Sequence, residues 1–231
     1  VLVEDVDVVV VLVAVLEGAA TGLFYLAIQA MKNPAVVSFL GNAGPVFVTL
    51  MSITFLRERY TFFQMLGIAI ALSGLLIMNY RQGSFSGFAE PGSAFVLSAS
   101  FLFALATIFG RKFHRYLNPA FMSLVRSVLL SAVMIFLYFI LRDDNPLLIK
   151  LHIWRNLALG SLLETLVVIV FAYMALKLIE ATKTSLIIST KGVWALILSW
   201  IFLNVFPTSM QLGGGLLTLA GVWLITTKRI K

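Results

Sequence analysis

The sequence predicts an all-α polytopic membrane protein of about eight transmembrane helices. Composition is the first reason: 61% of the 231 residues are hydrophobic and 12% are charged, whereas soluble domains carry about 25% charged residues. The second reason is that the apolar residues form long runs, since a helix needs about 20 of them to cross a bilayer. With a mean hydropathy of +1.02, the apolar excess must face lipid.

Eight apolar runs are long enough to be membrane spans. The connectors between them contain Gly, Pro, Asn or charged residues, which end helices. The runs are too long and continuous for the strands of a membrane barrel. The expected spans are residues 8–31, 36–56, 62–80, 92–110, 119–141, 156–178, 184–203 and 210–227.

Lys and Arg are unevenly distributed between the two ends of these helices. The end with the N-terminus has ten, namely Arg57, Arg59, Arg111, Lys112, Arg115, Lys177, Lys183, Lys228, Arg229 and Lys231. The opposite end has five, namely Lys32, Arg81, Arg142, Lys150 and Arg155. Cytoplasmic loops are enriched in Lys and Arg, so both termini are predicted to be cytoplasmic. The expected location is a bacterial inner membrane.

Residue types exclude several kinds of site. The chain has no Cys, so it has no disulfide, thiolate metal site or cysteine nucleophile. His114 and His152 lack metal-ligand spacing, and neither a metal nor another cofactor is expected. The net charge of +7 is assigned to membrane topology and not to nucleic-acid binding. Without an HExxH motif or an intramembrane His, we do not expect an enzyme.

The chain contains an internal duplication, which is a common feature of transporters. Residues 55–67 resemble residues 202–214. Four pairs of identical residues lie 147 apart (211 − 64 = 147), namely Gln64 and Gln211, Gly67 and Gly214, Gly74 and Gly221, and Glu17 and Glu164. Two pairs lie 148 apart, namely Tyr25 and Tyr173, and Gly44 and Gly192.

The two copies are expected to have opposite orientations in the membrane. Span 8–31 leaves the end that holds the N-terminus, whereas its match, span 156–178, returns to that end. The expected division is a first repeat of three helices (residues 1–80), a loop (81–91) and a second repeat of five helices (92–231). An even division predicts two further helices before Val1.

The pattern of Pro45, Glu58, Gln64, Gly67 and Gly74 resembles the EamA-type branch of the drug/metabolite transporter superfamily. The second half repeats part of this pattern with Gln211, Gly214 and Gly221. The resemblance implies ten helices in two inverted repeats, a central cavity and secondary transport of small metabolites. The second half departs from the pattern at Val205, where Glu58 would have its equivalent.

Two glutamates are candidates for proton coupling, because a charge inside the bilayer is costly and usually functional. Glu17 lies about 14 Å into its span at about 1.5 Å per residue, and Glu164 lies at a similar depth from the opposite side. Either could instead make a helix–helix hydrogen bond or pair with a basic residue. Glu58 sits at a helix end between two arginines, where a loop ion pair and a gating role are both possible.

Six further residues are candidates for substrate binding. Lys191, followed by Gly192 and with Trp194 about one helical turn on, is a plausible anchor for a carboxylate or phosphate. Arg126 could hold such a group bidentately, or it could extend its charge to lipid headgroups or pair with a glutamate. Asn42, Tyr25 and Tyr173 could line a cavity, although polar contacts between helices and core packing explain them equally well.

Together these features predict a secondary transporter that moves a small polar, anionic or zwitterionic metabolite by alternating access. The alternative is a non-transporting integral subunit or scaffold of a larger membrane assembly. Expected partners are the small-molecule substrate, membrane lipid and a coupling proton. A homodimer is possible, and no nucleic acid is expected.

Overall fold

The computed structural model describes residues 3–31, 37, 40–80, 92–113, 118–140, 151–204 and 206–227. All regular secondary structure in these residues is helical. The elements are α1 (Val3–Ala30), α3 (Ala43–Phe55), α4 (Phe62–Asn79), α5 (Gly92–Lys112), α6 (Pro119–Ile140), α7 (Leu151–Leu163), the π-helix η2 (Glu164–Ile169), α8 (Val170–Leu178), α9 (Ala181–Ser189), α10 (Lys191–Leu203) and α11 (Ser209–Thr227).

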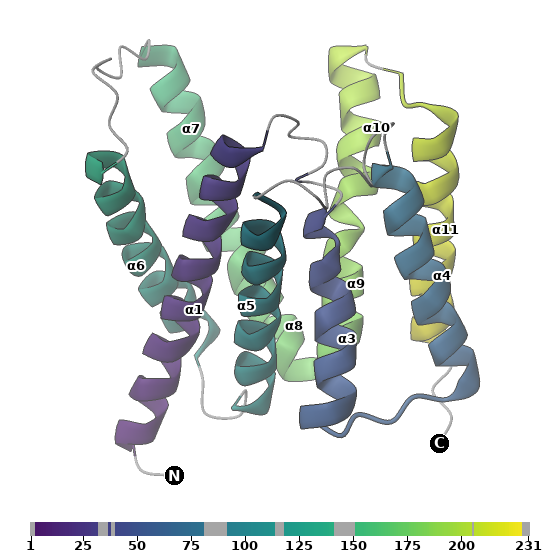
Figure 1. Ribbon diagram of the computed structural model, residues 1–231, viewed down its shortest axis with the longest axis horizontal. Helices are drawn as coiled ribbons and strands as arrows, with labels where there is room; N and C mark the ends of the chain where they lie inside the picture. The colour runs from purple at the N-terminus through teal and green to yellow at the C-terminus, as the bar shows by residue number, and fades with distance from the viewer. Residues whose placement is uncertain are drawn as a thin grey trace.

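The helices stand roughly parallel to one another, and both chain ends lie at the same end of the molecule (Figure 1). Helix α1 leaves that end, whereas α7, η2 and α8 return to it (Figure 1). The predicted all-α polytopic architecture with oppositely running repeats is therefore confirmed.

Six of the eight predicted spans are helices long and apolar enough to cross a membrane. They are Val8–Ala30, Phe62–Asn79, Gly92–Lys112, Ala158–Leu178, Ala181–Phe202 and Ser209–Thr226. The other two predicted spans correspond to α3, with the shorter apolar helix Ala43–Phe55, and to α6, which extends over Pro119–Ile140.

Two predicted spans differ from the observed helices. The span expected at 184–203 begins earlier, at Ala181, because Glu180 has extended backbone and ends the preceding connector. It is also divided at Thr190, which lies between α9 and α10. The span expected at 156–178 begins at Leu151 and contains the π-helix Glu164–Ile169. Hydropathy does not detect such changes, because backbone geometry varies there without a change in apolar content.

The π-helix accounts for the change in repeat spacing. Glu17 and Glu164 are 147 residues apart, whereas Tyr25 and Tyr173 are 148 apart. The second copy therefore holds one more residue between its Glu and its Tyr. The π-helix occupies this interval, and a π turn accommodates an additional residue within an α-helix.

The connectors before α4 and α11 have the same geometry, which supports the duplication. Arg57 and Asn204, 147 residues apart, are the only described non-glycine residues with positive φ, and both have φ of 53°. Each helix then begins with a Thr and a Gln, and the side chain of each accepts a hydrogen bond from the backbone nitrogen of the other. In α4 the Thr61 nitrogen donates to Gln64 Oε1 over 2.9 Å, and in α11 the Thr208 nitrogen donates to Gln211 Oε1 over 2.8 Å.

Repeat-related glycines bring α4 and α11 into close contact. A Cβ atom added at Gly74 would lie 2.6 Å from the Gly214 carbonyl oxygen, and one at Gly221 would lie 2.6 Å from the Gly67 oxygen. No real side chain fits at such distances. Small residues allow this approach of helix backbones, which contributes van der Waals packing where lipid weakens the hydrophobic effect.

The packed interior forms two main clusters. One joins α1, α3, α5, α6 and α8 and includes Val13, Met51 and Tyr173, and the other joins α4, α9, α10 and α11 and includes Leu75 and Ile225. Helix α9 contributes to both, through Ala181 and Leu186 respectively. It therefore connects the two packed regions.

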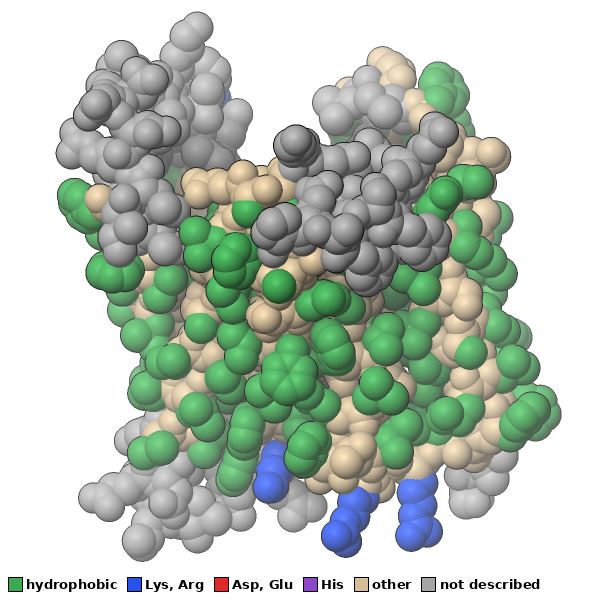
Figure 2. Space-filling model, viewed as in Figure 1, with side chains coloured by type: hydrophobic (Ala, Val, Ile, Leu, Met, Phe, Trp, Pro, Cys, Tyr) green, Lys and Arg blue, Asp and Glu red, His purple; other side chains and the backbone are tan. Residues whose placement is uncertain are grey.

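Basic side chains gather at one end of the molecule. On the face shown in Figure 2, the clearly visible Lys and Arg side chains lie at the end that holds both termini. The band between the ends is largely hydrophobic on this face (Figure 2). This distribution is the one expected of a multi-pass membrane protein.

We predict that Gly214→Ala lowers thermal stability in detergent, whereas Gly213→Ala does not. A Cβ at Gly214 would lie 2.7 Å from Gly74 oxygen, but one at Gly213 would meet nothing within 4 Å. Overpacking of this kind costs about 1–3 kcal/mol. The melting temperatures of the two variants test this, and equal melting temperatures would show that the α4–α11 contact is not tight.

Candidate functional site

The candidate site is a buried ion pair between α1 and α6. Glu17 lies near the middle of α1, and its carboxylate pairs through Oε2 with Nε of Arg126 on α6. Both side chains are largely buried, with exposures of 14% and 15%. Pairing reduces the cost of placing either charge at this depth, since an unpaired intramembrane charge costs about 2.5–3.5 kcal/mol on insertion scales.

Tyr173 completes the site from a third helix. Its hydroxyl donates to Oε1 of Glu17 over 2.9 Å, and its ring is packed in the cluster that joins α1, α5, α6 and α8. Each carboxylate oxygen of Glu17 therefore has a side-chain partner. We call Glu17, Arg126 and Tyr173 the triad.

The triad joins the two halves of the chain. Glu17 belongs to the stretch before residue 81, whereas Arg126 and Tyr173 belong to the stretch after residue 91. A polar contact of this kind can respond to relative movement of its helices. Guanidinium groups also bind carboxylates and phosphates bidentately, so Arg126 has the chemistry to bind an anion in place of Glu17.

Three of the eight residues predicted from the sequence thus come together. Their roles in binding and proton transfer stay predictions. The structural alternatives are also observed for two residues. Glu17 is paired with a basic residue, and Tyr173 packs in the core.

The other predicted residues lie elsewhere on the described helices. Lys191 is the first residue of α10 and is exposed, and Trp194 is 58% exposed. Tyr25 is 53% exposed on α1, unlike its buried equivalent Tyr173. Asn42 is the N-cap residue of α3. Glu164 begins the π-helix, and its side chain lies outside the described part of the chain.

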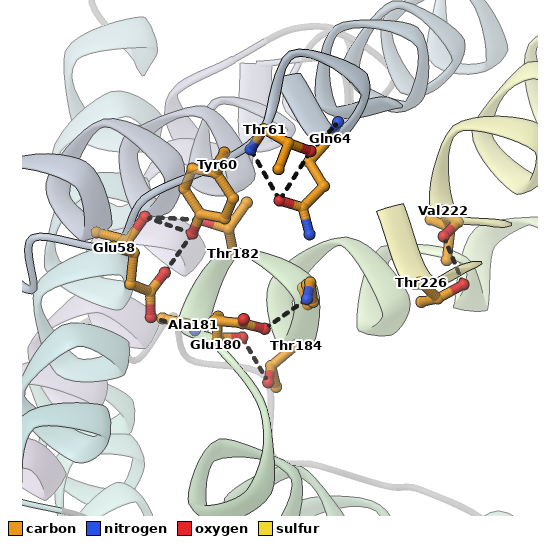
Figure 3. A network of polar contacts seen from close by, with 12 residues as sticks. Glu58, Tyr60, Thr61, Gln64, Glu180, Ala181, Thr182, Thr184, Val222 and Thr226 are labelled. Carbon is orange, nitrogen blue, oxygen red and sulfur yellow. Dashed lines mark hydrogen bonds and ion pairs between the residues drawn. The ribbon is translucent and has the colours of Figure 1, made fainter. Parts of the chain in front are cut away.

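A second polar network was not predicted from the sequence. It lies at the end that holds the termini, where the connector between α3 and α4 meets the start of α9 (Figure 3). Glu58 accepts hydrogen bonds from the Tyr60 hydroxyl and, over 3.0 Å, from the Ala181 backbone nitrogen. The Ser52 hydroxyl lies 2.7 Å from the Thr182 hydroxyl and 3.2 Å from the Tyr60 hydroxyl.

Ionisation in this region reflects its burial and its partners. Burial, with the hydrogen bond to Glu58, raises the pKa of Tyr60 above its usual range, so the phenol stays protonated and donates. The pKa of Glu180 is lowered overall. Burial alone would raise this pKa, but the hydrogen bond and charge of Lys183, 2.8 Å away, contribute more in the opposite direction. The Glu58–Val205 difference between the repeats was the sequence signal that could have located the network.

Comparison with known proteins decides the family. The sequence matches the EamA-like transporter family over residues 4–80 and 90–227. The chain belongs to this family. The predicted relationship to the drug/metabolite transporter superfamily is therefore confirmed.

Curated relatives of this EamA-like chain carry names that state transport and no substrate. It is 25% identical over 193 residues to the uncharacterized transporter YdfC of Bacillus subtilis, covering 82% of this chain and 61% of the relative. It is 28% identical over 198 residues to an uncharacterized transporter of Archaeoglobus fulgidus, covering 85% and 69%. The chain thus spans about three-fifths of the length of YdfC and about two-thirds of that of the archaeal relative.

A solved structure has the same fold. A crystal structure superposes with a TM-score of 0.69 at 14% sequence identity, covering 94% of this EamA-like chain and 86% of the other. At this identity the likeness concerns the fold alone. Its family and its membrane-spanning helices make the chain an integral multi-pass membrane protein.

We predict that Glu17 and Arg126 are strongly coupled energetically. Arg126→Gln leaves a buried carboxylate without its cation, and breaking a buried pair costs about 3–5 kcal/mol. Adding Glu17→Gln removes the uncompensated charge, so the double variant should melt at a higher temperature than Arg126→Gln alone. The melting temperatures of the two single variants and the double variant in detergent give the coupling between the residues. The exposed Ser131→Ala on α6 is the control. Additive losses would contradict a direct pair.

Proposed function

We propose that this protein is a secondary transporter that moves a small anionic or zwitterionic organic metabolite by alternating access. The observation that carries the proposal is the triad, a paired carboxylate and guanidinium held deep between the two halves of a transporter-family chain. Inverted repeats typically place a substrate site near the bilayer midplane between the repeats. The expected orientation has both termini in the cytoplasm of a bacterial cell.

Arg126 is the proposed anchor for the acidic group of the substrate. In the observed state, Oε2 of Glu17 pairs with the Arg126 guanidinium, and Oε1 of Glu17 accepts a hydrogen bond from the Tyr173 hydroxyl. A substrate carboxylate or phosphate can compete for the same guanidinium. Glu17 therefore acts as an internal anion that holds the site when no substrate is bound.

Proton coupling follows from this competition. When the substrate anion takes Arg126, Glu17 would be left as an unpaired charge among helices, which is costly. Binding a proton removes that charge and converts Glu17 from an acceptor into a donor. One proton then enters the site with each substrate anion, so substrate and proton move in the same direction.

Lys191 and Trp194 are proposed to line the route to the triad. Lys191 follows the break at Thr190 and begins α10, and both side chains are exposed. A charged residue within a membrane-crossing helix is usually functional, and Lys191 lies inside the span Ala181–Phe202. Asn42, Tyr25 and Glu164 stay candidates for the same pathway.

The alternative function is that of a non-transporting integral subunit. Its support is that many apolar side chains of α6 to α10 are exposed, for example Phe136, Leu163 and Trp200. Such surfaces can face lipid or a protein partner. A substrate-dependent response of the purified chain separates the two functions.

We predict that an anionic ligand class raises the melting temperature of the purified chain and that Arg126→Gln abolishes the shift. The probes are amino acids, dicarboxylates, sugar phosphates and nucleotide sugars. Lys191→Ala should weaken the shift, whereas Lys112→Gln, at the end of α5, should preserve it. No shift with any class, or an unchanged shift in Arg126→Gln, would contradict the proposal.

We further predict that Glu17→Gln changes coupling more than binding. In proteoliposomes, uptake of the ligand found above should rise when the outside is acidic relative to the inside. Glu17→Gln mimics the protonated carboxyl, so it should retain ligand binding while uptake loses its response to the proton gradient. Uptake of the variant that still follows the gradient would show that Glu17 does not carry the proton.

A further inference from the structure

The contact between the α3–α4 connector and the start of α9 joins the two halves of the chain. Its residues are separated by more than 120 positions in sequence. Glu58 provides the charged group, Tyr60 and Ser52 provide hydroxyls, and α9 provides the Ala181 nitrogen and the Thr182 hydroxyl. Glu58, Tyr60 and Ala181 point toward one another in Figure 3.

Glu58 occupies a favourable electrostatic position. The first backbone N–H groups of a helix lack partners within the helix, and the helix dipole favours a negative charge at this end. Glu180, the N-cap residue of α9, makes no side-chain cap. The carboxylate of Glu58 therefore takes the capping position from the other half of the protein, with a charge-assisted hydrogen bond.

The hydroxyl contact behind Glu58 is sealed from solvent. Ser52 and Thr182 are both fully buried, and their oxygens lie 2.7 Å apart. Water can reach them only if α3 and α9 separate. Because α9 also joins the two packed clusters, such a separation would open the end of the molecule that holds the termini.

The repeated connector before α11 lacks the acidic and phenolic groups of this contact in its sequence. At an offset of 147, Glu58 corresponds to Val205 and Tyr60 corresponds to Pro207. Neither has a carboxylate or a phenol, although the neighbouring turn and capping residues are repeated. Glu58 and Tyr60 therefore belong to one copy of the duplicated connector and not to both.

We propose that Glu58, Tyr60, Ser52, Ala181 and Thr182 form a latch that closes this end of the transporter and breaks whenever it opens. The role of the latch in a transport cycle rests on the proposed transport function. The latch also controls whether solvent reaches the start of α9, and this does not depend on transport. Its charged hydrogen bond adds stability to the closed end.

Thiol labelling tests the latch without any substrate. The chain has no Cys, so Thr182→Cys places a single thiol at the sealed contact. In detergent, N-ethylmaleimide should modify this thiol slowly. Adding Glu58→Gln should increase the rate about tenfold, since hydrogen bonds to charged groups are stronger than those between neutral groups. Adding Glu180→Gln should change the rate less than about twofold, because Glu180 pairs with Lys183 three residues along the same segment, and such local pairs contribute little.

Several results would overturn the latch. One is a rate that Glu58→Gln leaves unchanged, and another is an equal increase with Glu180→Gln, which would indicate general loosening. If Glu58→Gln fails to elute as a folded monodisperse protein, Tyr60→Phe replaces it and should accelerate labelling in the same direction. Labelling that stays slow in Tyr60→Phe also contradicts the proposal.

A reversible cross-link connects the latch to transport. Ser52→Cys with Thr182→Cys should form a disulfide on mild oxidation, because the native oxygens are in contact. The cross-linked protein should lose uptake and regain it on reduction. Full uptake by the cross-linked protein would overturn the latch. Accelerated labelling with Glu58→Gln but no uptake by any form would instead retain the latch and contradict the transport function.

Discussion

Hydrogen bonding in the absence of water is the constraint on which this structure depends. Helices provide hydrogen-bond partners for the backbone, and polar side chains must find their hydrogen-bond partners within the protein. Many Ser and Thr residues do so by donating to the carbonyl four residues earlier, as Thr49 does to Pro45 and Thr218 to Gly214. In the described part of the chain, no buried side-chain nitrogen or oxygen lacks a hydrogen-bond partner.

The same constraint explains why the polar groups that connect the halves occur in clusters. Glu17 uses both carboxylate oxygens, and Glu58 does the same at the end of the molecule. Each acid has one partner from an aromatic hydroxyl. A buried acid with a complete set of partners favours one arrangement of the surrounding helices. The two acids therefore specify how the halves fit together in the observed state.

Much of the fold was accessible from the sequence because membrane helices have a strong apolar signal. The duplication was also accessible, since glycines and capping residues recur at fixed spacing. The close α4–α11 contact could only be suspected from Gly74 and Gly214, because spacing does not reveal which helices meet. The break at Thr190 and the π turn at Glu164 were missed, because they alter backbone geometry within apolar sequence.

The site was partly accessible for a related reason. Charged residues inside apolar runs identified Glu17 and Arg126, but their pairing depends on how α1 and α6 are rotated. The network around Glu58 was missed because Ser52, Tyr60 and Thr182 are ordinary residues at helix ends. Only their three-dimensional placement gives them a shared role.

The π turn has a consequence for how duplicated halves become different. An additional residue in an uninterrupted α-helix would turn every following side chain by about 100°, whereas a π turn takes up the residue locally. Tyr173, beyond the turn, reaches Glu17, while its counterpart Tyr25, in an uninterrupted helix, is exposed. The repeat-related tyrosines thus have different surroundings although their side chains are identical. Two repeats of similar sequence can therefore contribute different residues to one site.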